Sequence, residues 1–125
     1  MIYPLESKEQ IAFIERVTWL HPRLLCHVVA VPNGGLRSKF TAARLKKEGV
    51  RPGFPDLIVL LPRGGYHGLL IEMKRIHGGI VSDVQSELHA LYRSVGYRVE
   101  VCCGATAAWI IFEEYVNGSV SRIAR

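Results

Sequence analysis

Residues 54–74, FPDLIVLLPRGGYHGLLIEMK, combine two apolar segments with charges in unexpected places. Residues 57–61 form a run of branched aliphatics typical of a buried strand, and the following PRGG favours a turn. Residues 68–74 return as the antiparallel partner, which predicts a β-hairpin. The returning strand nevertheless carries Glu72 and Lys74, which share one face because side chains two apart in a strand point the same way.

Asp56 opens the first strand of this hairpin, level with the charged end of the second. A regular two-residue turn at the glycine pair would place Asp56 opposite Met73, on the wrong face. An odd loop or a bulge would place it opposite Glu72 or Lys74, and two adjacent glycines make such an irregularity inexpensive. Convergence of the three charged side chains therefore requires a distorted hairpin or a bend at Asp56.

The rest of the chain alternates between helical and strand patterns. In order, the expected elements are a helix at 5–20, a strand at 24–31, a helix at 37–48, the hairpin, a helix from Ser82 to about Gly96, a strand at 97–103 and a helix at 105–116. Val84, Leu88, Leu91 and Val95 indicate the third helix. The order α-β-α-β-β-α-β-α predicts an α/β fold with a mixed central β-sheet flanked by helices, in a single domain over residues 1–125.

Composition narrows the class of protein. At 49% hydrophobic the chain is globular, and no apolar run approaches the length of about 18 residues that spans a membrane. The charged N-terminal segment does not resemble a secretory signal, and three cysteines give neither a disulfide framework nor zinc spacing. We expect an intracellular, cytoplasmic protein with no membrane partner.

The excess of positive charge is local. The net charge is +5, and outside residues 37–51 ten basic residues balance ten acidic ones. Within that segment one acid, Glu48, accompanies six basic residues, namely Arg37, Lys39, Arg44, Lys46, Lys47 and Arg51. A phosphate backbone attracts such a patch, although a solvated helix face has the same composition.

The three charged residues of the hairpin have two interpretations. Neighbouring carboxylates repel each other unless a cation joins them, and oxygen ligands suit Mg²⁺ or Mn²⁺. A lysine beside such a metal can orient a water or stabilise phosphate charge. The alternative is a salt bridge at a sheet edge.

The spacing of Pro55-Asp56 and Glu72-x-Lys74 resembles the PD-(D/E)xK nuclease signature. Further segments make the chain similar to one branch, the VRR-NUC family: E-x-x-x-Q at 6–10, PNGG at 32–35, GVRPGFPDL at 49–57, GLLIEMK at 68–74 and GGIVSDVQ at 78–85. Together these cover roughly residues 5 to 102. The Val-Arg-Arg element for which the branch is named is not found as those letters.

The resemblance implies a restriction-endonuclease-like fold and Mg²⁺- or Mn²⁺-dependent hydrolysis of DNA phosphodiesters. It implies that Asp56, Glu72 and the backbone carbonyl of Met73 hold the metal, with Glu6 as a further ligand. Lys74 would position the attacking water. Glu6 has an alternative role as an acid favoured at a helix N-terminus.

Two further assignments follow from the resemblance and also keep rivals. Gln85 would sit beside the catalytic residues, but it also follows Ser82 at capping-box spacing. Asn33 and Gly34 would contact the DNA backbone, or would form only a turn. The histidines show no ligand spacing and receive no role.

The resemblance also implies a homodimer that acts on branched DNA such as four-way junctions, in DNA repair or recombination. A paired site suits paired incisions on a two-fold substrate. The alternatives are a DNA-binding module without catalysis and an RNA-cleaving nuclease on the same fold.

Overall fold

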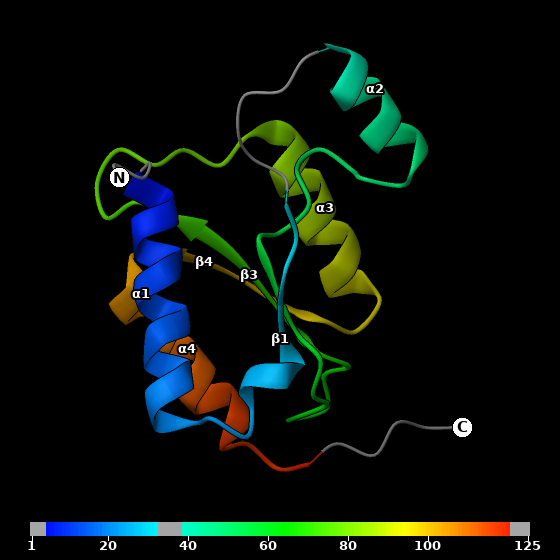
Figure 1. Cartoon of the computed structure of the whole chain (residues 1–125). Helices are drawn as coiled ribbons and strands as arrows, with labels where there is room; N and C mark the ends of the chain where they lie inside the picture. Colours follow the sequence, from blue (N-terminus) through cyan, green and yellow to red (C-terminus); the bar gives the residue numbers. More distant parts are fainter. Residues whose placement is uncertain (1–4, 33–38, 121–125) are drawn as a thin grey trace.

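The computed structural model describes residues 5–32 and 39–120, and its elements follow the predicted order (Figure 1). The helices are α1 (Leu5–Leu20), the short 3-10 helix η1 (Leu25–His27), α2 (Lys39–Lys47), α3 (Asp83–Ser94) and α4 (Ala105–Val116). The strands are β1 (Val28–Ala30), β2 (Leu57–Val59), β3 (Leu69–Lys74) and β4 (Arg98–Cys103). Among the described residues, no helix has the length and apolarity needed to cross a membrane.

The four strands form one mixed sheet in the order β1-β2-β3-β4. The first two pairings are antiparallel, and β3 pairs with β4 in parallel through the α3 crossover. Helices α1 and α4 cover one face and α3 covers the other (Figure 1), which confirms the predicted architecture. The strand expected at 24–31 is shorter than predicted, because its first half is η1, closed by a hydrogen bond from the His27 N–H to the Leu24 carbonyl.

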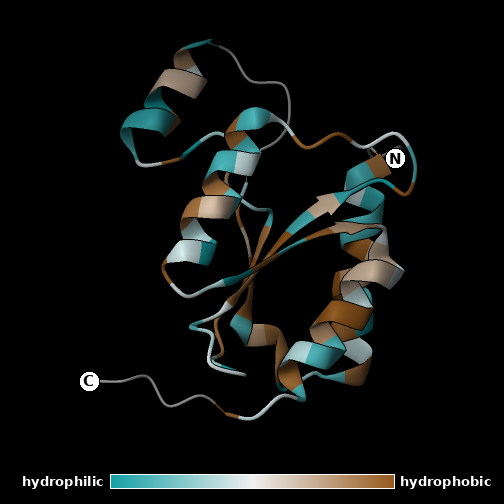
Figure 2. Cartoon of the chain, turned by 180° about the vertical axis from the view of Figure 1, so that it is seen from behind, coloured by the Kyte–Doolittle hydropathy of each residue, from teal (hydrophilic) through white to brown (hydrophobic). Residues whose placement is uncertain are grey.

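The hydrophobic core lies between the sheet and the pair α1 and α4. Leu69, Ile71 and Met73 point into it from alternate positions of β3, and the rings of Phe13 and Phe112 meet edge to face at 5.6 Å. Figure 2 shows the apolar residues concentrated along the strands and on the helix pair α1 and α4 at the right of the view. The even-numbered side chains of β3 must therefore face α3.

The hairpin has the distortion that convergence of Asp56, Glu72 and Lys74 requires. Arg63 pairs with Tyr66 across the two glycines, both of which have positive φ, as in a tight two-residue turn. That register would carry Asp56 to Met73. The strands instead pair Leu57 with Ile71, so one residue is absorbed between turn and strands, and the next pair along is Asp56 and Glu72.

Candidate functional site

Asp56 and Glu72 approach each other at the open end of the hairpin. The Asp56 carbonyl accepts a hydrogen bond from Val31 N–H at 2.8 Å, which fixes its backbone beside β1. Its side-chain Oδ2 accepts the Met73 N–H at 2.7 Å. Because the N–H and C=O of a strand residue point to the same side, the Met73 carbonyl oxygen also faces Asp56, while its side chain is buried in the core.

Glu72, one of the two carboxyl groups, has a strongly raised pKa. Glu72 is only 2% exposed, and burial, followed by hydrogen bonding to Asp56 and the charge of Asp56, raises its pKa to about 9. Lys74 opposes this effect, while the more distant Glu6 adds to it. At neutral pH the pair therefore retains a proton that a cation placed between the carboxylates would displace.

Lys74 is held by the start of α3. Its side chain is 6% exposed, and its Nζ donates to Gln85 Oε1 at 3.2 Å. The same amide oxygen accepts the Ser82 N–H at 2.9 Å, and Ser82 Oγ accepts the Gln85 N–H, completing a capping box. The capping role of Gln85 is thus confirmed, and the same amide oxygen contacts Lys74; a part for Gln85 in catalysis stays a prediction.

Glycine allows the segment before Asp56 to pack closely against α3. Gly53 has φ +79°, and a Cβ there would lie 2.6 Å from Cγ1 of Val84. The positive φ and this close approach both favour glycine. The contact brings the chain before Asp56 against the start of α3, where the cap holds Lys74.

His89 belongs to the same cluster, although no role was predicted for any histidine. Its Nε2 lies 3.4 Å from Glu72 Oε1, and it is 3% exposed. Burial, then the positive charges of Arg93 and Lys74, lower the pKa of His89, which favours the neutral imidazole. The signal that could have found it is its position four residues after Gln85, on the same helix face.

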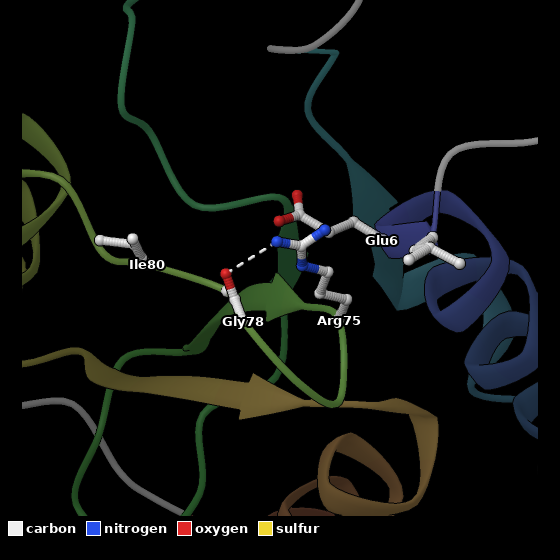
Figure 3. A pocket seen from close by; sticks show the side chains of 6 residues that line it. Glu6, Arg75, Gly78 and Ile80 are labelled. Atoms are coloured by element: carbon white, nitrogen blue, oxygen red, sulfur yellow. Dashed lines mark hydrogen bonds between the residues drawn. The ribbon is translucent and has the colours of Figure 1, made fainter.

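Glu6 lies apart from the two central carboxylates. It is exposed on the first turn of α1 and lines a pocket of about 300 Å³ with Arg75, Gly78 and Ile80, as Figure 3 shows. Arg75 donates to the Gly78 carbonyl at 3.0 Å. Over residues 5–32 and 39–120, no three His, Cys, Asp or Glu side chains are grouped closely enough to hold a metal. A direct ligand role for Glu6 remains a prediction.

The donor set fits a hard divalent cation. Two carboxylates and one backbone carbonyl supply oxygen only, which suits Mg²⁺ or Mn²⁺ with water completing the shell. Burial is the largest cause of the raised pKa of Glu72, and the neighbouring charge of Asp56 adds to it; a cation between the two carboxylates would offset that repulsion. Residues of this chain that would hold it are Asp56, Glu72 and Met73 through its carbonyl.

The predicted DNA contacts lie on and around α2. Lys39, Arg44, Lys46, Lys47 and Arg51 are all exposed, and α2 has no buried residue. Figure 1 shows α2 standing beyond α3, away from α1 and α4. Asn33, Gly34 and Arg37, the other predicted contacts, fall outside the described residues.

PD-(D/E)xK, restriction-endonuclease-like domains have an aspartate that follows a proline at one strand and Glu-x-Lys on the next, on a mixed sheet flanked by helices. This chain has that arrangement in Pro55-Asp56 and Glu72-x-Lys74. The VRR-NUC domain family model matches residues 5–106, so the chain belongs to the VRR-NUC family, a nuclease-type domain of DNA processing. A solved structure described as a VRR_NUC domain protein is similar with a TM-score of 0.81 at 25% identity, covering 98% of this chain and 100% of that one. No curated protein matches the chain.

Proposed function

We propose that this chain is a Mg²⁺- or Mn²⁺-dependent deoxyribonuclease that hydrolyses phosphodiester bonds within DNA. The observation that carries the proposal is the hairpin register, which sets Asp56 opposite Glu72, with Lys74 on the same face. A bound cation would supply Lewis-acid stabilisation of the charge that develops on the phosphate.

The protein side chains have separable tasks in this proposal. Asp56, Glu72 and the Met73 carbonyl hold the cation, and Lys74 orients the attacking water. Gln85 fixes the Lys74 ammonium through its amide oxygen. His89, buried against Glu72, restricts the orientation of that carboxyl group.

We further propose that the substrate is branched DNA, such as a four-way junction, and that the protein acts as a homodimer. The support is membership of the VRR-NUC family together with the sequence resemblance to its small stand-alone members. Two sites related by a two-fold axis would match the two incisions that such a junction requires.

The test is a panel of end-labelled duplex, flap, splayed and four-way DNAs, with an RNA version of the preferred one, incubated with Mn²⁺ or Mg²⁺. We expect products from a branched DNA and none from Asp56→Asn. Arg23→Met, which removes an exposed charge beyond the opposite end of α1, is the control and should cleave normally. Cleavage by Asp56→Asn would exclude this site, preference for the RNA would exclude the DNA assignment, and a monomer by light scattering would contradict paired incision.

A further inference from the structure

A second hollow, of about 480 Å³, lies beside the carboxylate pair on the α3 face of the sheet. Phe54 and Ile58, which line it, are the residues two before and two after Asp56. Ile58 lies in β2, where alternate residues share a face, so it lies on the same side of the sheet as Asp56. Tyr92 lines it from α3, three residues beyond His89 and so on a neighbouring part of that helix face. Two residues of strand span about 7 Å, so the hollow begins roughly one such step from Asp56.

Aromatic and apolar side chains, those of Phe54, Tyr92, Val50 and Ile58, line the hollow. The rings of Phe54 and Tyr92 meet edge to face with centroids 5.3 Å apart, and Tyr92 meets Tyr97 in the same way at 6.0 Å. Phe54 and Tyr92 are only partly buried, as are Val50 and Ile58. Half-buried aromatic rings around a hollow of this size are the surfaces on which planar bases stack.

The rim of the hollow is charged and leads to the basic helix. Glu48 and Arg51 line the same hollow, and both are exposed. Glu48 directly follows α2, whose last residues are Lys46 and Lys47. Phosphates held by Lys46, Lys47 and Arg51 would lead the DNA strand past the hollow towards Asp56. At the rim, the Glu48 carboxylate can accept a hydrogen bond from the edge of a base and the planar Arg51 guanidinium can donate one.

We propose that this hollow takes one unstacked nucleobase of the DNA strand whose phosphate is cut at Asp56. The inference rests on the proposed nuclease function and adds a reason for its substrate preference. Extracting a base from a duplex costs unstacking and unpairing energy, which is least for a base that is already unpaired. A base at a branch point enters the hollow at lower cost than a base within a continuous duplex.

The test measures binding with EDTA present, so that no strand is cut. Splayed DNAs carry a single abasic residue at each successive position near the branch, and affinity is measured by fluorescence anisotropy. For the wild-type protein, one abasic position should weaken binding about tenfold, since stacking of one base on an aromatic ring is lost. In Val50→Trp, which fills the hollow, and in Tyr92→Leu, which removes a ring but keeps an apolar side chain, the same abasic residue should change affinity less than twofold.

Ile110→Trp is the matched control, because Ile110 is exposed on α4, on the opposite face of the sheet. It should show the full abasic effect. Circular dichroism identifies any variant that does not fold, and the other hollow variant then decides. An abasic effect of equal size in wild type and in a folded hollow variant overturns this inference alone, as does the absence of any sensitive position. A wild-type protein that binds no DNA overturns the proposed function together with it.

Discussion

The protonation of Glu72 provides a quantitative test of the carboxylate pair. The side chain is 2% exposed, and burial beside Asp56 raises its pKa from 4.5 to about 9. Between these two values the folded protein binds a proton that the unfolded chain has released, so the free energy of unfolding falls as pH rises. The stabilising contribution is fully present below about pH 4.5 and is lost as pH rises through 9.

The magnitude follows from the shift in pKa. Each pKa unit corresponds to about 1.4 kcal/mol, so Glu72 alone makes the wild-type protein lose about 5 kcal/mol between pH 5 and pH 9. Glu72→Gln keeps the shape of the protonated carboxyl group but cannot ionise. We therefore expect a flatter stability profile for Glu72→Gln and a more stable protein than wild type at pH 8.5.

Urea unfolding in EDTA, followed by the fluorescence of the buried Trp109, gives the free energy of unfolding at each pH. Glu87→Gln makes the same chemical change at an exposed position of α3 and should leave the wild-type profile nearly unchanged. Parallel profiles for wild type and Glu72→Gln between pH 5 and pH 9 would exclude both the raised pKa of Glu72 and the buried pairing that causes it.

Three further predictions concern the metal, the basic helix and the cap. Mg²⁺ or Mn²⁺ at about 100 times its Kd should stabilise the folded wild-type protein by about 3 kcal/mol. If a thermal-shift titration shows the same metal-induced stabilisation in Asp56→Asn, Asp56 is not a ligand. If Lys46 and Lys47 each contact a phosphate, removing both positive charges should lower the slope of log affinity against log salt by about 2. An unchanged slope in anisotropy titrations from 50 to 200 mM salt would show that the DNA does not bind along α2. Ser82→Ala should lower stability by about 1 kcal/mol and leave the cleavage rate nearly intact. Gln85→Ala should lower stability and also slow cleavage. Equal cleavage rates for the two variants would show that Gln85 acts only as a helix cap.

Much of the fold could be predicted from local patterns. The helices at both ends match the predicted bounds. The hairpin was also predicted, but its register was left open: the glycine pair forms a regular two-residue turn, and the extra residue is absorbed between that turn and the strands. The face of α3 was not predictable in this way: Val84, Leu91 and Val95, three of the apolar residues that indicated the helix, are about half exposed. An apolar stripe identifies a helix, but only the opposing surface decides which side is buried, and here that surface carries Glu72.

The same limit applies to the candidate site. Strand parity alone could place Glu72 and Lys74 on one face from the sequence. Asp56 joins them only through the irregular register of the hairpin, which local patterns left open. The spacing from Gln85 to His89 gives the helix face of His89, but its contact with Glu72 also depends on how α3 lies across the sheet. The distance of Glu6 from the central pair likewise depends on the packing of α1.

The most direct test of the central claim is the single-turnover rate at which Lys74→Met cleaves a four-way junction in Mn²⁺, measured beside its affinity for the same DNA. If Lys74 orients the attacking water, the rate should fall by about 10²- to 10⁴-fold while affinity changes little. Arg23→Met should match the wild-type protein in both quantities. A Lys74→Met protein that folds, binds and cleaves at the wild-type rate would exclude Lys74 as the residue that orients the attacking water.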